Sequence, residues 1–210
     1  MATIVLIDAQ ALIHRSYHAL PPLTSPKGEV VNAVFGFATV FLKMLRELKP
    51  THVAACFDLP APTFRHQEYD KYKATRPAMP DELARQIVRV KELLGAFHVR
   101  SYEFAGFEAD DLLGTIIEKI KNQKPRINDY NIVIVTGDLD MLQLVDEKVG
   151  VYTLRRGMQD TVFYDETAVL ERYGLKPNQL ADLRGLRGDA SDNIPGVPGI
   201  GEKTASALLQ

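Results

Sequence analysis

Apolar residues recur along this chain with two different spacings. Short runs rich in β-branched residues predict strands over residues 3–7, 52–57, 98–104, 131–135 and 149–154. Longer stretches with apolar residues three and four positions apart predict helices over residues 31–48, 81–97 and 108–121. Strands and helices that alternate in this way are typical of an α/β fold, with a mostly parallel sheet flanked by helices on both faces.

Two segments break the alternation. Residues 59–80 contain Pro, Lys, Arg and Tyr without a clear apolar face, which indicates an exposed excursion from the sheet where an arch could form. A helix is expected to begin near Pro177, and the Gly- and Pro-rich residues 188–204 then predict a tight hairpin between helices. We therefore expect a core over residues 1–175 and a second region over residues 176–210.

The composition is that of an ordinary globular protein, with 46% hydrophobic and 25% charged residues among 210. The apolar run at residues 4–7 is shorter than the roughly 7–15 residues of a signal sequence and is stopped by Asp8. We expect a cytoplasmic protein with no membrane role. Cys56 is the only cysteine and lies in an apolar run, so a buried packing role is expected.

The formal net charge of −2 does not exclude nucleic acid as a partner, because two bound divalent cations would reverse its sign. The distribution of charge is more informative than the total. Residues 103–111 carry four acidic residues and no basic one, whereas Arg65, Lys71, Lys73 and Arg76 lie within one short stretch.

Acidic residues recur directly after the predicted strands. They are Asp8, Asp58, Glu108, Asp110, Asp111, Asp138 and Asp140. Because the carboxyl ends of parallel strands meet at one edge of a sheet, these side chains should converge. Each Asp alone is also explained as a helix N-cap. Seven carboxylates together, however, would repel one another and raise each other's pKa unless cations offset their charge.

A divalent metal is the simplest source of that positive charge. Oxygen ligands favour hard ions such as Mg²⁺ or Mn²⁺, and a lone cysteine provides no thiolate cluster for zinc. On a helix, Glu108 and Asp111 share a face and Asp110 lies about 200° from Glu108, so one of the three would act through water. Asp189 and Asp192, three residues apart, could complete a second metal site.

Two such ions can activate water for attack on a phosphodiester and stabilise the departing oxygen, so no protein nucleophile is required. The sequence accordingly lacks a Gly-x-Ser-x-Gly elbow, a His-Glu-x-x-His pair and a Walker-type phosphate loop.

Candidate contacts to a nucleic-acid strand lie in the excursion and after the first strand. Residues 72–76 interleave an aromatic with cations, the combination that stacks bases and neutralises a phosphate backbone, and Arg65 precedes them. A solvated charged loop is the alternative. Arg15 and Tyr17 follow Asp8 and are candidates for positioning a substrate, although a surface Arg and a core Tyr explain them equally well.

The tail hairpin offers a further candidate contact. Gly199 and Gly201 are followed by Lys203 and Thr204 at the start of a predicted helix. Backbone N–H groups at a helix start can hold a phosphate without reading base sequence, and Lys203 would add charge. A plain structural turn is the alternative.

Six motifs together resemble the flap endonuclease family, in particular the 5′ nuclease domains of bacterial DNA polymerases of the polymerase I type. The motifs are Leu6-Ile-Asp8, Phe57-Asp58 with Thr63-Phe-Arg65, Tyr72-Lys-Ala-Thr-Arg76, Phe107-Glu-Ala-Asp-Asp111, Thr136-Gly-Asp-Leu-Asp140 and residues 188–203. The resemblance covers essentially the whole chain. It implies a PIN-like fold with a helical arch at about residues 59–80 and a C-terminal helix-hairpin-helix (H3TH) motif that begins near residue 176.

The resemblance also implies roles for individual residues. A first metal site would use Asp8, Asp58, Glu108, Asp110 and Asp111, and a second would use Asp138, Asp140, Asp189 and Asp192. Lys73 and Arg76 would reach the scissile phosphate from the arch. Residues 188–204 would grip duplex DNA and hold K⁺ on backbone carbonyls.

The activity implied is metal-dependent cleavage of DNA at 5′ ends and 5′ flaps, which in replication and repair removes RNA primers and displaced strands. The partners implied are branched or nicked DNA and an RNA primer strand, and we expect a monomer that is natively fused to a polymerase. Because the chain stops at Gln210, inside the second helix of the tail motif, we expect a fragment of a longer protein.

Two alternatives share part of this pattern. A PIN-type ribonuclease or a phosphatase would have the carboxylate pocket without the arch and hairpin, and residues 188–204 argue against it. A module that binds branched DNA without cutting it would need no full set of metal ligands, and the complete set of acids argues against that.

Overall fold

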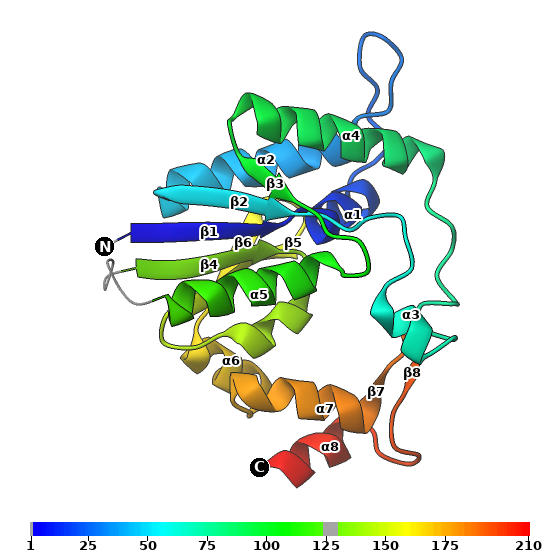
Figure 1. Ribbon diagram of the computed structural model, residues 1–210, viewed down its shortest axis with the longest axis vertical. Coiled ribbons are helices and arrows are strands. Elements are labelled where there is room, and N and C mark those ends of the chain that lie inside the picture. Colours follow the sequence, from blue (N-terminus) through cyan, green and yellow to red (C-terminus); the bar gives the residue numbers. More distant parts are fainter. Residues whose placement is uncertain (1, 124–129) are drawn as a thin grey trace.

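A six-stranded sheet forms the centre of the protein, whose computed structural model describes residues 2–123 and 130–210 (Figure 1). The strand order is β3-β2-β1-β4-β5-β6, with β6 antiparallel to β5 and the other pairs parallel. The strands are β1 (Ala2–Asp8), β2 (His52–Cys56), β3 (Arg100–Tyr102), β4 (Tyr130–Thr136), β5 (Val149–Arg156) and β6 (Asp160–Tyr164).

The central strands bury side chains on both of their faces. In β1, Val5 and Ile7 belong to one hydrophobic cluster, whereas Leu6 between them belongs to the other. In β4, Val133 likewise belongs to the first cluster and Ile134 to the second. This is why these strands read as continuous apolar runs in the sequence rather than as alternating patterns.

Helices cover both faces of the sheet (Figure 1). Residues of α1 (Ala9–Ala19), α2 (Asn32–Leu48) and α4 (Asp81–Ala96) complete the first cluster. The second cluster contains residues of α5 (Ala109–Asn122), the 3₁₀ helix η1 (Leu139–Leu144), α6 (Glu166–Tyr173), α7 (Leu180–Arg187) and α8 (Glu202–Leu209). Large side chains anchor these layers; Phe37 and Phe41 of α2 are almost fully buried, and each such burial stabilises the fold by about 1.5–3 kcal/mol.

The predicted α/β fold is confirmed, and the predicted helices agree with α2, α4 and α5 to within one residue at each end. The strand predicted over residues 98–104 is shorter, because residues 98 and 99 still close the end of α4. The amide of His98 donates to the Gly95 carbonyl, that of Val99 donates to the Leu94 carbonyl, and His98 has a φ of 57°. The sequence patterns had not indicated β6 or α6.

The excursion at residues 59–80 does leave the sheet, but it is helical only over α3 (Phe64–Glu68). The rest of the expected helical arch consists of turns and extended chain. The helix expected near Pro177 begins as the 3₁₀ turn η2 (Pro177–Gln179) and continues as α7. The predicted hairpin follows, with β7 (Gly188–Asp189) paired to β8 (Ile194–Pro195), and α8 comes after it.

Cys56 is fully buried, as the sequence predicts. Within the described residues, no helix combines the length and the apolar character needed to cross a membrane.

Candidate active site

Carboxylates gather at the carboxyl ends of the strands, where neutral donors fix several of them. Asp8 ends β1 and caps α1: its Oδ1 accepts from the Ala11 amide at 3.0 Å, and its Oδ2 accepts from the Thr136 hydroxyl at 2.7 Å. Asp58 follows β2 and accepts from the Ala109 amide at 2.7 Å. The N-cap explanation therefore holds for Asp8, and it does not compete with a place in a shared site.

These carboxylates line one cavity of about 280 Å³. Its walls carry eight of the nine predicted metal ligands, namely Asp8, Asp58, Glu108, Asp110, Asp138, Asp140, Asp189 and Asp192. They come from the ends of β1, β2 and β4, the start of α5 and the hairpin after α7. The side chains of Lys73 and Arg76 from the arch complete the wall.

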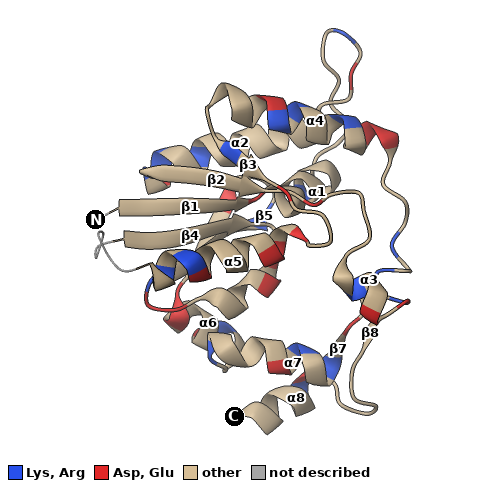
Figure 2. Ribbon diagram, in the orientation of Figure 1, with Lys and Arg blue, Asp and Glu red and all other residues tan. Residues whose placement is uncertain are grey.

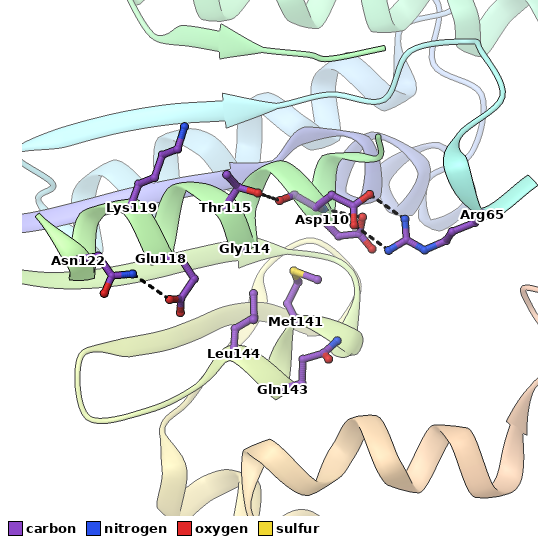
Figure 3. Close-up of a pocket in the computed structure, with 11 residues that line it drawn as sticks. Arg65, Asp110, Gly114, Thr115, Glu118, Lys119, Asn122, Met141, Gln143 and Leu144 are labelled. Atoms are coloured by element: carbon purple, nitrogen blue, oxygen red, sulfur yellow. Dashed lines mark hydrogen bonds and ion pairs between the residues drawn. The ribbon is translucent and has the colours of Figure 1, made fainter. Parts of the chain in front are cut away.

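Asp111 is the predicted ligand that does not line this cavity. It faces Arg65 instead, which donates to its two carboxylate oxygens at 2.7 Å each. Asp110 lines both this cavity and a groove of about 570 Å³ that runs along α5, and Arg65 lies at the same end of that groove (Figure 3).

The helical projection, which grouped Glu108 with Asp111, assumed that all three acids lie in the helix. Glu108 does not lie in the helix; it is the N-cap of α5 and has an extended backbone with φ −98° and ψ 166°. The Asp111 carboxylate accepts from the Glu108 amide at 2.9 Å, as in a capping box, and is turned away from the cavity. Asp110 consequently faces the cavity together with Glu108.

Four carboxylates of the cavity hold their protons more tightly than usual. Burial raises the pKa of Asp8 to about 7, because the hydrogen bonds from Ala11 and Thr136 lower it by less than burial raises it, and the charges of Asp58 and Asp138 add smaller increases. Burial and the neighbouring Asp111 raise the pKa of Asp110 to about 6. The pKa values of Asp58 and Asp140 are raised as well, mainly by burial and then by nearby acids.

Two other carboxylates show the opposite shift because cations or several donors contact them. Burial raises the pKa of Asp111, but the hydrogen bonds from Arg65 and from the Glu108 amide, together with the charges of Arg65 and Lys73, outweigh it, so the pKa lies below its usual value. At Asp189 the effect of burial is outweighed by hydrogen bonds from Ser191 and by the charge of Arg184, and the pKa is again lowered. A cation alone does not decide the direction, since Asp140 also contacts Arg184 and yet burial and Asp138 raise its pKa to about 8.

The arch brings its cations to the same cavity. Figure 2 shows basic segments of the arch around α3 close to acidic segments of the hairpin at β7 and β8. Lys73 Nζ donates to Glu108 Oε2 at 2.8 Å, and the guanidinium of Arg76 pairs with Asp192. The Lys73 amide donates to the Asp192 carbonyl at 2.9 Å, and Asn193 Nδ2 donates to the Lys71 carbonyl at 2.8 Å. One backbone hydrogen bond and one side-chain hydrogen bond therefore join the arch directly to the hairpin.

The donor set fits hard divalent cations, since its ligands are carboxylate oxygens and acidic groups outnumber cationic ones along the cavity wall. As the side chains now lie, no three or more His, Cys, Asp or Glu among the described residues are placed to hold a metal ion. Amino and guanidinium groups instead contact Glu108, Asp140 and Asp189. Occupation by metal would therefore require these cations to withdraw from the oxygens.

Three of the residues predicted to contact substrate do not line the cavity and contact other parts of the protein. Arg15 donates to the Arg155 carbonyl at 3.2 Å and lines a neighbouring hollow that shares Asp138 with the cavity. Tyr17 packs against the first hydrophobic cluster. Tyr72 was expected to stack on bases, but its ring is 4% exposed and its hydroxyl donates to Glu108 at 2.9 Å, so base stacking does not fit this arrangement.

The predicted tail contacts lie at the start of α8, outside the cavity lining. Gly201 is the N-cap of α8, and Gly199 has a φ of 81° in the preceding turn. Lys203 and Thr204 are exposed in the first turn of this helix. These positions leave the helix start accessible to a ligand.

Sequence reasoning missed three residues around the cavity. Arg184 contacts both Asp140 and Asp189 from the last turn of α7, a position where a basic residue also favours the helix dipole. Gln10 and His14 line the cavity from α1 and contact each other at 3.2 Å. Their four-residue spacing just after Asp8 could have placed them on one face of a helix.

Comparisons with known proteins agree with this architecture. Residues 3–174 match the family described as 5′-3′ exonuclease, N-terminal resolvase-like domain, and residues 175–210 match 5′-3′ exonuclease, C-terminal SAM fold. The DNA polymerase I of Bacillus subtilis is 43% identical over 207 residues, which is 99% of this chain and 23% of that protein. The chain thus spans about a quarter of the length of this relative.

Two solved structures show the same fold. The T5 D15 protein co-crystallised with metal ions has a TM-score of 0.73 at 20% identity, over 98% of this chain and 74% of that one. The catalytic core of Rad2 in complex with DNA substrate has a TM-score of 0.59 at 20% identity, over 99% of this chain and 60% of that one. With its sheet, its carboxylate cavity and matches over residues 3–210, the chain belongs to the 5′-3′ exonuclease family.

Proposed function

We propose that this chain is a 5′ nuclease that hydrolyses phosphodiester bonds of DNA at 5′ ends and 5′ flaps. The observation that carries the proposal is the single cavity lined by eight carboxylates and by Lys73 and Arg76. Membership of the 5′-3′ exonuclease family supports the reaction. The complex of the similarly folded Rad2 core with DNA supports the class of substrate.

The metal is the second part of the proposal. We assign two or more Mg²⁺ or Mn²⁺ ions to the cavity, with Asp8, Asp58, Glu108 and Asp110 on one side and Asp138, Asp140, Asp189 and Asp192 on the other. Asp111 would act indirectly, through the Glu108 amide and Arg65. The metal ions in the T5 D15 crystals support this assignment. Bound ions would supply an activated water and stabilise negative charge on the phosphate.

The residues of the chain itself have three tasks in this proposal. Asp8 and Asp138 are held in place because each also caps a helix. Lys73 and Arg76, which now contact Glu108 and Asp192, are long enough to turn to the oxygens of a phosphate entering the cavity. Arg65 keeps Asp111 away from the cavity by its two hydrogen bonds and thereby fixes the start of α5.

Finer features of the proposal concern partners and context. We assign K⁺ to backbone carbonyls of residues 188–204, and we propose a monomer that also accepts an RNA primer strand as the cleaved strand. The match to 23% of a DNA polymerase I supports a native fusion to a polymerase. Dependence of duplex binding on K⁺ rather than Na⁺ would test the first of these features.

The decisive experiment uses a 5′-labelled flap DNA with Mg²⁺, with EDTA and with the variant Asp138→Asn. We expect cleavage near the junction that is lost in EDTA and in the variant. Asp165→Asn is the matched control, because Asp165 also caps a helix by accepting from an amide, at 2.8 Å, but lies outside the cavity lining. Asn caps helices as well as Asp, so both variants should fold.

Equal cutting in EDTA would contradict the metal-dependent mechanism, and equal loss in both variants would reduce the effect to helix capping. Single-stranded RNA and a small phosphate monoester are included as substrates. Preference for either one over the flap DNA would favour a ribonuclease or a phosphatase instead.

A further inference from the structure

Three phenylalanine rings form a row that begins beside Arg65, a residue of the groove along α5, and ends in solvent. Phe64 of α3 contacts Phe107, and Phe107 contacts Phe104, with 5.7 Å between ring centroids in both pairs. At the inner end of the row, the guanidinium carbon of Arg65 lies 4.6 Å from the centre of the Phe64 ring. Phe107 immediately precedes Glu108, which lines the cavity.

The outer two rings are unusually exposed for apolar side chains. Phe104 is 60% exposed and Phe107 is 43% exposed. Their loop is nevertheless held in place, because the Phe64 amide donates to the Gly106 carbonyl at 3.0 Å and the Phe107 amide donates to the Phe104 carbonyl at 3.3 Å. The rings are therefore presented to solvent by ordered backbone on both the arch and the loop, and adjacent exposed aromatics indicate a binding surface.

We propose that the row of Phe64, Phe107 and Phe104 is a stacking platform for the bases of a single-stranded 5′ segment of DNA whose scissile phosphate lies in the carboxylate cavity. This inference rests on the proposed function and adds the path of the unpaired strand. Every base offers a flat face to an aromatic ring, so such a platform binds strands of any sequence.

Cations flank the inner end of the row, whereas the segment 103–111 that carries the outer two rings holds four acids and no base, of which Glu103 pairs with Lys91 and Asp111 with Arg65. Arg65 borders the inner ring, and the arch that carries Phe64 also carries Lys71, Lys73 and Arg76. Basic groups that track phosphates next to rings that stack bases are the usual combination in single-strand binding. The bases of a duplex stack on one another and leave no face free for these rings, so the unpaired segment is the part of the substrate that fits.

The absence of tryptophan from the chain allows a direct test. Phe104→Trp introduces the only indole, whose fluorescence is quenched when a base stacks on it. The variant is titrated in EDTA, to prevent cleavage, with a nicked duplex and with the same duplex carrying a flap of about ten nucleotides. We expect quenching by the flap substrate and little change with the nicked one.

Phe163→Trp is the matched control, since Phe163 is 47% exposed on β6 at the opposite edge of the sheet, where its ring lies over Gly150. Its fluorescence should respond to neither substrate. Equal emission of the Phe104→Trp variant with both substrates, when anisotropy shows that both are bound, would overturn the platform and favour a protein partner for these rings.

A kinetic arm with Mg²⁺ separates this inference from the proposed function. Phe104→Ala should raise KM for the flap substrate about tenfold, the loss of one stacked base, and leave kcat and the nicked substrate within about twofold. Equal effects on both substrates, or none on either, would contradict the platform while wild-type cleavage still stands. If the wild type cleaves neither substrate, the proposed nuclease function itself fails.

Discussion

The carboxylates at the strand ends and those beside the arch and hairpin differ in what balances their charge. Asp8 and Asp58 accept hydrogen bonds from neutral groups, and burial raises the pKa of both. Asp111 and Asp189 are contacted by Arg65 and Arg184, and their pKa values are lowered. The first pair therefore marks where positive charge is missing from the protein, and a metal ion would supply it there.

The largest expected effect is on the free energy of unfolding, whose dependence on pH should have opposite signs for Asp8 and Asp111. In the folded protein Asp8 keeps its proton up to about pH 7, whereas its usual pKa is 3.8. The folded state thus binds more protons than the unfolded state between these two pH values. The contribution of Asp8 to stability is therefore complete below about pH 4 and is lost as pH rises through 7. For Asp8 alone the free energy of unfolding without metal should fall by about 4 kcal/mol over this range.

Urea denaturation in EDTA at several pH values measures this. Asp8→Asn should flatten the dependence and stabilise the protein near pH 8, because the amide is never charged. Asp111→Asn should instead destabilise the protein at neutral pH, since the lowered pKa of Asp111 gives a contribution that is present above its usual pKa and lost as pH falls. If both variants shifted stability in the same direction, the distinction between the two groups would be invalid.

Gly188→Ala should disrupt the hairpin side of the cavity while leaving the strand ends in place. Gly188 has a φ of 78°, and an added Cβ would lie 2.4 Å from the Gly196 nitrogen and 2.7 Å from the Ile194 carbonyl oxygen. The resulting shift of Asp189 should slow flap cleavage about a hundredfold, the usual cost of misplacing a reacting group by an ångström.

Gly185→Ala is the control for this substitution. Gly185 lies within α7, and a Cβ there meets nothing within 4 Å, so alanine should stabilise the helix and leave cleavage unchanged. A loss of activity in Gly185→Ala as large as that in Gly188→Ala would show that any change near α7 matters, rather than the hairpin geometry.

Lys73→Ala should slow cleavage by more than about tenfold, which is less than the effect expected for Gly188→Ala. Duplex affinity should be nearly unchanged, because the target of Lys73 is the reacting phosphate. Single-turnover rates with bound substrate, together with binding isotherms, separate the two quantities. Lys73→Arg retains the charge and should recover part of the rate. Loss of binding without loss of turnover would reassign Lys73 to electrostatic anchoring of DNA.

The same two regions differ in how much of the site could be predicted from the sequence. The acids at the strand ends were predictable because apolar strand patterns place them at one sheet edge, whatever the details of the loops. The orientation of Asp111 was not, because it depends on Glu108 being an N-cap rather than a helical residue. Arg184 and the burial of Tyr72 depend on contacts between α7, the hairpin and the arch, which no local pattern encodes.

The central claim is that the carboxylate cavity binds hard divalent ions, and titration of the protein with Mn²⁺, monitored by electron paramagnetic resonance, tests it most directly. We predict at least two bound ions per wild-type chain and fewer in the double variant Asp8→Asn/Asp140→Asn, with Asp165→Asn equal to wild type. Absence of Mn²⁺ binding by the wild type, or equal stoichiometry in the double variant, would contradict the account.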